Sequence, residues 1–270
     1  MKISARFATS LLAILTSTSV FAQERWRVLD PENTLIIESS KGRLILEMRP
    51  DMAPKSVERV KLLAREKVYD GLQFHRVIAN FVAQTGNPNN RDGGGTSHPN
   101  LAPEMMFKQT LNSGEILTSN SSDSVSGFLG SVPFQATPIT ELIKNTKGSL
   151  RAWGAHCPGI AGMGRNEARD SANSELYFML DSARRLDRDY TVFGRIVVGM
   201  DVLKNMTHGE PPAQPDVMET VRVLADIPAA ERPKVSVMTG SALSAEIEKI
   251  RQQKGADFSV CDVFIPSKVE

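Results

Sequence analysis

The sequence carries almost no net charge, which bears on the partners the protein can have. Its 32 Lys and Arg residues nearly balance its 31 Asp and Glu residues, so the formal net charge is +1. A chain without excess positive charge has no broad electrostatic attraction for nucleic acid or for an anionic membrane surface. We therefore expect neither of these as the main partner.

Long apolar runs are also missing beyond the N-terminus. Spanning a bilayer takes ~20 apolar residues, and no later segment reaches that length. The N-terminus has Lys2 and Arg6, then a short apolar run over 11–15, then small residues up to Ala22. These features predict a signal peptide over residues 1–22, cleaved after Ala22. The alternative, an uncleaved anchor, fits poorly because Ser and Thr interrupt the run. We expect a periplasmic or secreted protein without membrane insertion.

Common catalytic and metal-binding motifs are absent. The sequence contains no P-loop, no G-x-S-x-G, no H-E-x-x-H and no C-x-x-C. The triple glycine at 93–95 lacks the Lys-Ser/Thr that follows in a P-loop, so it indicates a turn. The four histidines are scattered without a second His or Cys at useful ligand spacing: His75, His98, His156 and His208. We expect neither a metal nor a cofactor.

Only two cysteines are present, Cys157 and Cys261. In an oxidising compartment such a pair can form one disulfide, and otherwise they are two unrelated thiols. A bridge would close a loop on the order of 100 residues, which the chain-entropy model values at ~4–5 kcal/mol before strain is subtracted. The cysteine count alone leaves both possibilities open.

The apolar pattern predicts a mainly β chain. Residues 34–39 and 43–49 are β-rich runs separated by Ser40-Lys41-Gly42, which predicts a hairpin. A helix is predicted from Pro54, because apolar residues follow it at helical spacing as far as Gly71. Residues 73–85 predict two strands with a tight turn at Ala79-Asn80. Further strands are expected at 149–153, 175–180, 190–198 and 220–225, and a second short helix at 199–206.

Two segments differ from the rest of the chain. Residues 108–147 are rich in Ser, Thr and Asn, and they predict a long excursion with a short helix from Thr140. Residues 227–270 combine a strand-like KVSVM, an amphipathic helix around Leu243 and Ile247, and a β-prone end. Because this tail has apolar faces to bury, we expect it to dock on the main body.

One stretch, FHRVIANFVAQTGNP from residue 74, carries a family resemblance. It resembles the signature of the cyclophilin family of peptidyl-prolyl isomerases, usually F-H-R-V-I-x-x-F-M-x-Q-G-G-D-P. Three other stretches resemble family segments in the same order: KGRLILEMRPDMAPKSVERVKLLAREKVYDG, GGGT followed by APEM, and YTVFGRIVVGMDVLKNMTHGEP. The resemblance covers most of residues 34–226, apart from the excursion.

The resemblance implies a fold and an activity. The fold is an eight-stranded antiparallel β-barrel capped by two helices over residues 31–226, with an insert at about 108–147. Residues 227–270 add a small α/β C-terminal extension. The activity is cis/trans isomerisation of X–Pro bonds, here in exported proteins and in support of their folding. The implied substrates are proline-containing polypeptides, and we expect a monomer.

The resemblance also assigns roles to residues of the opening stretch. Arg76 is the implied catalytic residue, which donates hydrogen bonds to the substrate proline carbonyl. Gln84 is implied to hydrogen-bond the substrate backbone, and Phe81 and Val82 to form the apolar floor under the proline ring. Rotation about an amide breaks no bond, so a fixed donor suits it better than a base or nucleophile. Without the resemblance, Arg76 and Gln84 would be interpreted as solvated strand residues.

The rest of the implied site departs from the family pattern. Where the family reads S-Q-F-F, residues 174–177 read Ser-Glu-Leu-Tyr, so Glu175 replaces an amide near Arg76 and Tyr177 replaces a pocket Phe. We expect Glu175 either to orient Arg76 through a charge-assisted pair or to occupy it.

Two further stretches complete the implied substrate site. We match the family's M-A-N-A to residues 152–155, which makes Trp153 a wall that narrows the groove and Gly154 a source of backbone hydrogen bonds. Leu186 matches an apolar family residue, Tyr190 replaces a His and Arg185 replaces an aromatic.

Two alternatives to an isomerase follow from these departures. Trp153, Glu175 and Arg185 favour a proline-peptide binding or chaperone module with weak or no isomerase activity. The insert suggests a scaffold that docks a partner through Phe128, Leu129, Val132 and Phe134. The segment between Trp153 and Ser174 holds Cys157 beside the implied groove, so a bridge to Cys261 would tie the tail to this region, and we favour that hypothesis.

Overall fold

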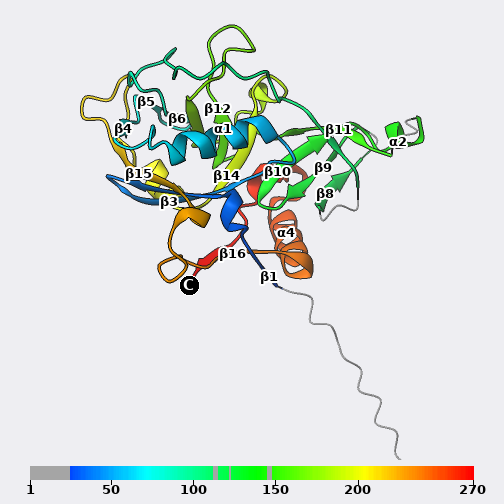
Figure 1. Cartoon of the computed structure of the whole chain (residues 1–270). Coiled ribbons are helices and arrows are strands. Elements are labelled where there is room, and N and C mark those ends of the chain that lie inside the picture. The colour runs from blue at the N-terminus through cyan, green and yellow to red at the C-terminus, as the bar shows by residue number, and fades with distance from the viewer. Residues whose placement is uncertain (1–24, 112–114, 122, 145–147) are drawn as a thin grey trace, which may run out of the picture.

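A single curled antiparallel sheet forms the body of the protein. The computed structural model describes residues 25–111, 115–121, 123–144 and 148–270 (Figure 1). The strand order is β4-β15-β2-β3-β14-β12-β13-β6-β5. The bounds are β2 Thr34–Ser39, β3 Gly42–Met48, β4 Leu72–Gln73, β5 Arg76–Ile78, β6 Val82–Thr85, β12 Ile160–Met163, β13 Leu176–Met179, β14 Val192–Val198 and β15 Val217–Val223.

The two ends of this strand order lie next to each other in the sequence. Only Phe74 and His75 separate β4 from β5, so the sheet must curl until its edges meet. The prediction of a mainly β chain built on a curled antiparallel sheet is confirmed. The sheet counts nine strands in the described part of the chain, one more than the expected eight.

Alternation along the predicted hairpin shows that both faces of the sheet are buried. Leu35 and Ile37 pack in one hydrophobic cluster, whereas Ile36 between them packs in the other. Successive side chains of a strand point to opposite faces, so one strand serves both cores. Helix α1, Pro54–Arg65, buries its Val57 and Val60 in the first cluster.

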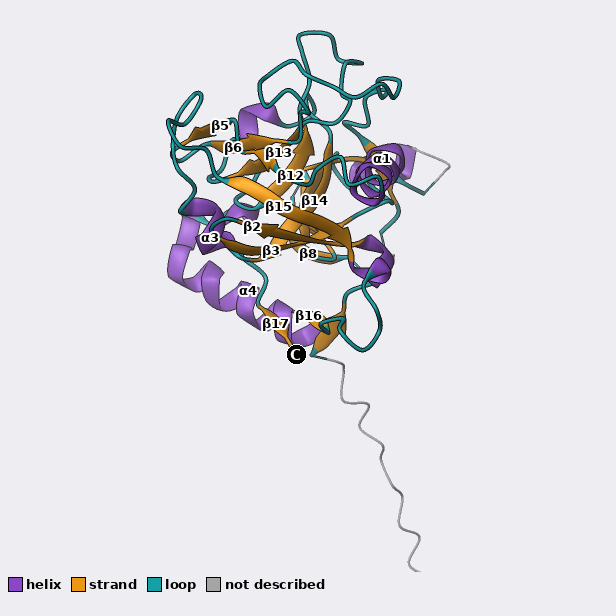
Figure 2. Cartoon of the chain, turned by 60° about the vertical axis from the view of Figure 1, so that its left-hand side comes forward, coloured by secondary structure: helices purple, strands orange, loops and turns teal. Residues whose placement is uncertain are grey.

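The two predicted capping helices are both present. Helix α1 begins at Pro54, whose missing N–H would have no intrahelical partner at this position anyway. Helix α3, Met200–Lys204, begins after Gly199, which adopts φ +91°. Figure 2 shows the helices at the periphery of the strands.

The segment predicted as an excursion is mostly a second sheet. Its strand order is β7-β11-β10-β9-β8, and α2 (Thr140–Lys144) begins at the expected residue. The strands are β7 Phe107–Gln109, β8 Ile116–Asn120, β9 Val125–Leu129, β10 Val132–Ala136 and β11 Leu150–Gly154. The scaffold hypothesis is wrong in its docking residues, because β9 and β10 turn them into the core. The four side chains are at most 2% exposed: Phe128, Leu129, Val132 and Phe134.

The tail forms a third sheet together with the first described strand. Strand β16 (Val235–Met238) pairs with both β1 (Trp26–Val28) and β17 (Ser267–Val269), and helix α4 spans Gly240–Lys254. Arg195, which is 1% exposed, joins the body to the tail. Its guanidinium donates to the carbonyls of Pro158, Ser131 and Val263 at 3.0 to 3.2 Å.

The two cysteines are bridged. Cys157 and Cys261 lie 4.8 Å apart at Cα and share an S–S bond of 2.03 Å, which confirms the favoured hypothesis. The bridge connects the tail to the segment just before β12. The predicted signal peptide lies outside the described residues. Among the helices that the structure describes, none combines the length and the apolar character needed to cross a membrane.

Candidate functional site

The β5–β6 hairpin brings the two polar residues of the opening stretch together. In the β5–β6 ladder Arg76 lies directly opposite Gln84, and in the β6–β13 ladder Gln84 lies opposite Tyr177. The predicted tight turn is present, with Asn80 at φ +57° and the Phe81 N–H donating to the Ile78 carbonyl at 3.1 Å. Three neighbouring strands therefore present their side chains to one site.

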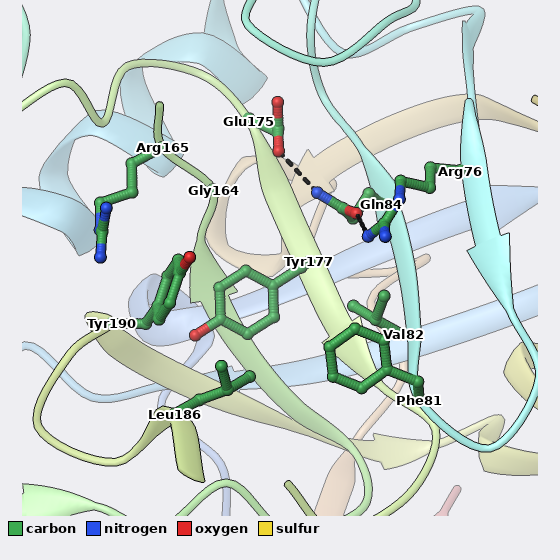
Figure 3. Close-up of a pocket in the computed structure, with 10 residues that line it drawn as sticks. All are labelled: Arg76, Phe81, Val82, Gln84, Gly164, Arg165, Glu175, Tyr177, Leu186 and Tyr190. Atoms are coloured by element: carbon green, nitrogen blue, oxygen red, sulfur yellow. Dashed lines mark hydrogen bonds between the residues drawn. The ribbon is translucent and has the colours of Figure 1, made fainter. Parts of the chain in front are cut away.

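These strands border a cavity of about 100 Å³. Ten residues line the cavity (Figure 3): Arg76, Phe81, Val82, Gln84, Gly164, Arg165, Glu175, Tyr177, Leu186 and Tyr190. Eight of these ten are site residues that the sequence predicts. Gly164 and Arg165 are the two that sequence reasoning missed. A small, mainly apolar recess edged by a few polar groups is the usual form of a ligand site.

The apolar part of the cavity is formed by rings and branched side chains. Val82 and Tyr177 are buried, and the Tyr177 and Tyr190 rings meet edge to face with centroids 6.0 Å apart. The Arg185 guanidinium lies 4.6 Å from the centroid of the Phe81 ring. A cation therefore partly covers the aromatic ring at this edge of the cavity.

A chain of hydrogen bonds forms the polar wall. Nη1 of Arg76 donates to Oε1 of Gln84, and Nε2 of Gln84 donates to Oε1 of Glu175 at 2.8 Å (Figure 3). The prediction of a direct pair between Glu175 and Arg76 is wrong, because the Gln84 amide lies between them. This arrangement fixes the amide orientation, since its oxygen must face the cation and its nitrogen the carboxylate.

A second carboxylate, missed in the sequence, contacts Arg76 directly. Nε of Arg76 donates to Oε2 of Glu210 at 2.7 Å. Glu210 lies in the loop between α3 and β15 and its side chain is 54% exposed, against 26% for Arg76. No spacing in the sequence signals this contact, because 134 positions separate the two residues.

Glu175 is a buried carboxylate, 7% exposed. Burial raises its pKa, and the hydrogen bonds from Gln84 and Asn87 oppose this rise only in part. The Glu175 side chain fits here because residue 164 is a glycine, since a Cβ at that position would lie 2.3 Å from Oε1 of Glu175. Gly164 also donates its N–H to the Glu175 carbonyl at 2.8 Å.

Beneath the cavity, Tyr177 belongs to a buried polar triad. Its hydroxyl shares a 2.7 Å hydrogen bond with Nε2 of His156, and Nδ1 of His156 shares one of 2.9 Å with Oδ1 of Asp187. Burial raises the pKa of Tyr177 well above its usual value, so the phenol stays neutral. The hydroxyl is therefore a structural anchor for the ring that lines the cavity.

The prediction that Trp153 and Gly154 line the groove is wrong. Both lie on β11 in the five-stranded sheet, where Trp153 is 8% exposed with the Arg188 guanidinium 5.0 Å from its ring. Gly154 faces Val192, whose Cβ would be 2.5 Å from an added Cβ. Strand β12, not β11, pairs with β13 on the side away from β6, and Gly164 and Arg165, which follow β12, line the cavity. Only this long-range pairing distinguishes β12 from β11 as the strand next to the site.

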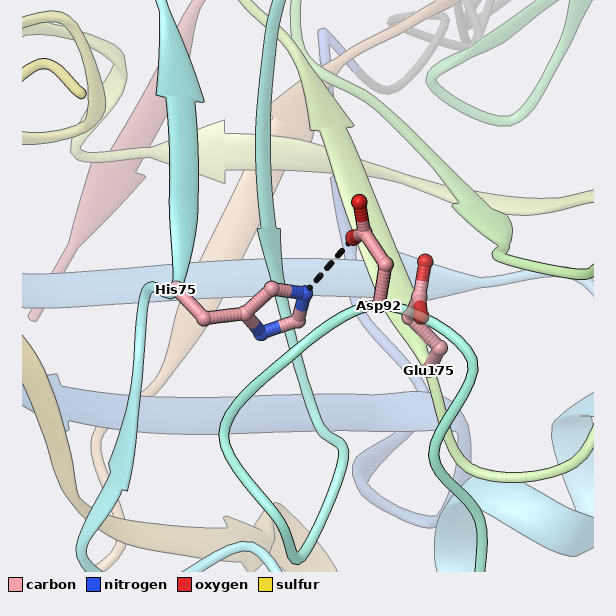
Figure 4. A group of neighbouring side chains, drawn as sticks. All are labelled: His75, Asp92 and Glu175. Atoms are coloured by element: carbon pink, nitrogen blue, oxygen red, sulfur yellow. Dashed lines mark hydrogen bonds and ion pairs between the residues drawn. The ribbon is translucent and has the colours of Figure 1, made fainter. Parts of the chain in front are cut away.

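Three possible metal ligands gather next to the polar wall. His75, Asp92 and Glu175 each place one ligand atom within 4.8 Å of the other two (Figure 4). Burial lowers the pKa of His75 although its hydrogen bond to Asp92 opposes this, so the imidazole is neutral at pH 7. No sequence motif indicates this group, because its members come from three separate segments.

Comparisons with known proteins agree with this geometry. The model of the cyclophilin type peptidyl-prolyl cis-trans isomerase/CLD family matches residues 34–225. A Brucella suis protein named as a probable peptidyl-prolyl cis-trans isomerase is 31% identical over 208 residues, which cover 73% of this chain and 83% of that protein. A Schizosaccharomyces pombe peptidyl-prolyl cis-trans isomerase is 28% identical, over 63% of this chain and 82% of that protein.

A solved structure supports the same relationship. The crystal structure of cyclophilin AquaCyp293 from Hirschia baltica superposes with a TM-score of 0.82 at 30% identity, covering 90% of this chain and 93% of that one. The family model matches residues 34–225, and both a relative and a solved structure are at least 30% identical over most of the chain, so the chain belongs to the cyclophilin-type peptidyl-prolyl cis-trans isomerases.

Proposed function

We propose that this cyclophilin isomerises X–Pro bonds of exported polypeptides, with Arg76 as the catalytic residue. The observation that carries the proposal is the position of the Arg76 guanidinium at the edge of an apolar cavity, held by Gln84 and Glu210. Phe81, Val82 and Leu186 line that cavity and would receive the proline ring.

The physics of the reaction fits such a site. Amide resonance sets a rotation barrier of ~18–20 kcal/mol, and the uncatalysed X–Pro exchange takes tens to hundreds of seconds. Resonance is lost in the twisted state, so a donor that is stronger towards that state than towards the planar one lowers the barrier. One preorganised donor contributes on the order of 3 kcal/mol.

Arg76 has donors to spare for a substrate. Nε and Nη1 contact Glu210 and Gln84, and Nη2 has no hydrogen-bond partner among the described residues. Because the guanidinium is planar, fixing Nε and Nη1 also fixes the direction of the Nη2 hydrogens. No proton has to move, which agrees with a neutral Tyr177 and with a Glu175 already engaged by two amides.

Two features support an extracytoplasmic role. The first 22 residues have the composition of a secretory signal, and the Cys157–Cys261 disulfide suits an oxidising compartment. We include in the proposal that the protein acts as a periplasmic or secreted monomer and assists the folding of exported chains.

A proline-peptide binding module with little activity is the second candidate function. It is favoured by Glu210, whose carboxylate offsets the charge of Arg76, and by Arg185, which covers part of Phe81. A recess with these two features can still bind a proline peptide, but it stabilises the twisted amide less.

A protease-coupled or NMR exchange assay on short Xaa-Pro peptides separates the two functions. Arg76→Ala should lower kcat/KM by about 100-fold, the usual effect of removing one such donor. Arg43→Ala is the matched control, because Arg43 pairs with Glu38 on the exposed β2–β3 hairpin. Peptide binding without turnover in the wild-type chain would favour the binding module and contradict the isomerase.

A further inference from the structure

His75, Asp92 and Glu175 form a group at the end of the polar wall, which only Glu175 shares with the proposed catalytic site. His75 lies in the two-residue link between β4 and β5, Asp92 in the loop after β6, and Glu175 directly before β13. Nε2 of His75 is 3.1 Å from Oδ1 of Asp92, and all three ligand atoms lie within 4.8 Å of one another (Figure 4).

We propose that these three side chains bind one divalent transition-metal ion of the Zn²⁺ type. An imidazole nitrogen with two carboxylates is a common ligand set for such ions. Bonds of ~2.0–2.2 Å in a tetrahedral site put the ligand atoms roughly 3.3–3.5 Å apart. The His75–Asp92 separation of 3.1 Å is close to this range, and Asp92 has to rotate so that the three ligand atoms, which lie within 4.8 Å of one another, come closer by about 1 Å.

The required movement falls on the side chain that can make it. His75 and Glu175 are 3% and 7% exposed, so the surrounding packing holds both. The Asp92 side chain is 63% exposed on its loop and can rotate towards them. Two fixed ligands and one mobile ligand would allow an ion to enter and then be enclosed.

The site has an entrance and a suitable charge. A cavity of about 340 Å³ opens beside it, and its lining includes both His75 and Asp92. The Asp92 and Glu175 carboxylates can together offset the charge of a divalent ion, and none of the ion pairs among the described residues involves Glu175. Arg76 and Arg91 also line the cavity and oppose binding, so we expect a site that exchanges its ion rather than a permanent structural one.

An ion here would act on the isomerase site, an effect that rests on the proposed function. Oε1 of Glu175 accepts the hydrogen bond from Gln84, and Gln84 in turn fixes Arg76. A metal bound to the Glu175 carboxylate competes with the amides of Gln84 and Asn87, which both donate to it. Gln84 would then be held less firmly, and so would the Arg76 guanidinium that it contacts, so bound metal should slow turnover.

Calorimetry on the metal-free protein tests binding without reference to activity. Titration with ZnCl₂ should show saturable binding of one ion per chain, and Co²⁺ should give the visible absorption bands of a protein-bound ion that Zn²⁺ then removes. Asp92→Asn should weaken Zn²⁺ binding by at least tenfold. Because Asp92 is exposed, this variant does not endanger the fold.

Two matched variants serve as controls. Asp257→Asn removes another exposed aspartate, and His98→Gln removes the histidine that pairs with Glu66 elsewhere on the surface. Both should bind Zn²⁺ like the wild type. Absence of saturable binding, or equal binding in the wild type and Asp92→Asn, would overturn the proposed site.

A second arm measures peptide isomerisation with and without saturating Zn²⁺. We expect Zn²⁺ to lower kcat/KM several-fold in the wild type and to leave Asp92→Asn unaffected. Binding with unchanged turnover would overturn the link through Gln84. If the metal-free wild type is inactive, the proposed function fails, whereas calorimetry still decides the metal site.

Discussion

Nε of Arg76 donates a 2.7 Å hydrogen bond to the carboxylate of Glu210, which approaches from the loop that follows α3. With Gln84 contacting Nη1, the guanidinium is held at two points and cannot rotate freely. Glu210 is thus a positioning residue for Arg76, with no contact of its own to the apolar part of the cavity.

We predict that Glu210→Gln lowers kcat/KM on Xaa-Pro peptides several-fold. The guanidinium loses its charge-assisted partner, so part of its fixed orientation is lost. Stability should change by less than about 1 kcal/mol, because the pair is half exposed and such pairs contribute little. Steady-state kinetics and denaturant unfolding measure the two quantities.

Salt provides an internal check on this interpretation. Added salt screens the exposed pair, so it should lower the wild-type rate and leave the Glu210→Gln rate nearly constant. Glu219→Gln, which removes an exposed carboxylate of β15, is the control. A faster Glu210→Gln enzyme would show instead that Glu210 competes with substrate for Arg76.

The buried carboxylate of Glu175 gives a second prediction. Gln84 and Asn87 each donate to one of its oxygens, and a glutamine in its place offers only one acceptor oxygen. In Glu175→Gln the new NH₂ group therefore faces the donating NH₂ group of either Gln84 or Asn87. This repulsion loosens the contact between Gln84 and Arg76. We expect kcat/KM to fall several-fold. Peptide isomerisation rates equal to those of the wild type would refute this role.

What the sequence could predict depends on how local each contact is. Arg76, Phe81 and Gln84 line one cavity because one short hairpin sets their register, and the turn of this hairpin is visible in the sequence. Trp153 was misplaced because two strands, β11 and β12, both contain small residues, and only the tertiary fold determines that β12 pairs with β13. Glu210 reaches Arg76 from a distant loop, so no motif could identify it.

The insert contains a short turn motif that its overall composition does not reveal. Its Ser, Thr and Asn content predicted an excursion, yet Leu129 and Val132 flank a two-residue Gly130-Ser131 turn that is typical of a β-hairpin. Gly130 adopts φ +57°, as such turns often require. This turn, which the prediction of an excursion did not take into account, indicates the β9–β10 pair where the overall polarity of the segment does not.

The Tyr177–His156–Asp187 triad predicts a pH effect on stability. Burial raises the pKa of Asp187, but hydrogen bonds from His156 and the charge of Arg184 outweigh it, so the net pKa is lowered from 3.8. A carboxyl group whose pKa is lower in the folded than in the unfolded state stabilises the fold at pH values above its unfolded pKa. This stabilisation is lost as the pH falls through the folded-state pKa. Asp187→Asn should thus be less stable at pH 7 by roughly 1–3 kcal/mol.

The same variant should approach the wild type in acid. Once Asp187 is protonated in the wild type, both proteins carry a neutral side chain there, so the difference in unfolding free energy should shrink below pH 3.8. Denaturant unfolding at a series of pH values measures it. A difference that stays constant from pH 7 into acid would assign the effect to packing rather than charge.

The disulfide gives the last prediction. It links residues 104 positions apart, and in the chain-entropy model a loop of that size contributes ~4–5 kcal/mol by restricting the unfolded chain. The double variant Cys157→Ala, Cys261→Ala should lose several kcal/mol of unfolding free energy in denaturant. Its kcat/KM should stay near that of the wild type while folded, because neither cysteine lines the cavity and Arg195 still joins the tail to the body. Loss of turnover in a folded double variant would show that the tail also shapes the recess.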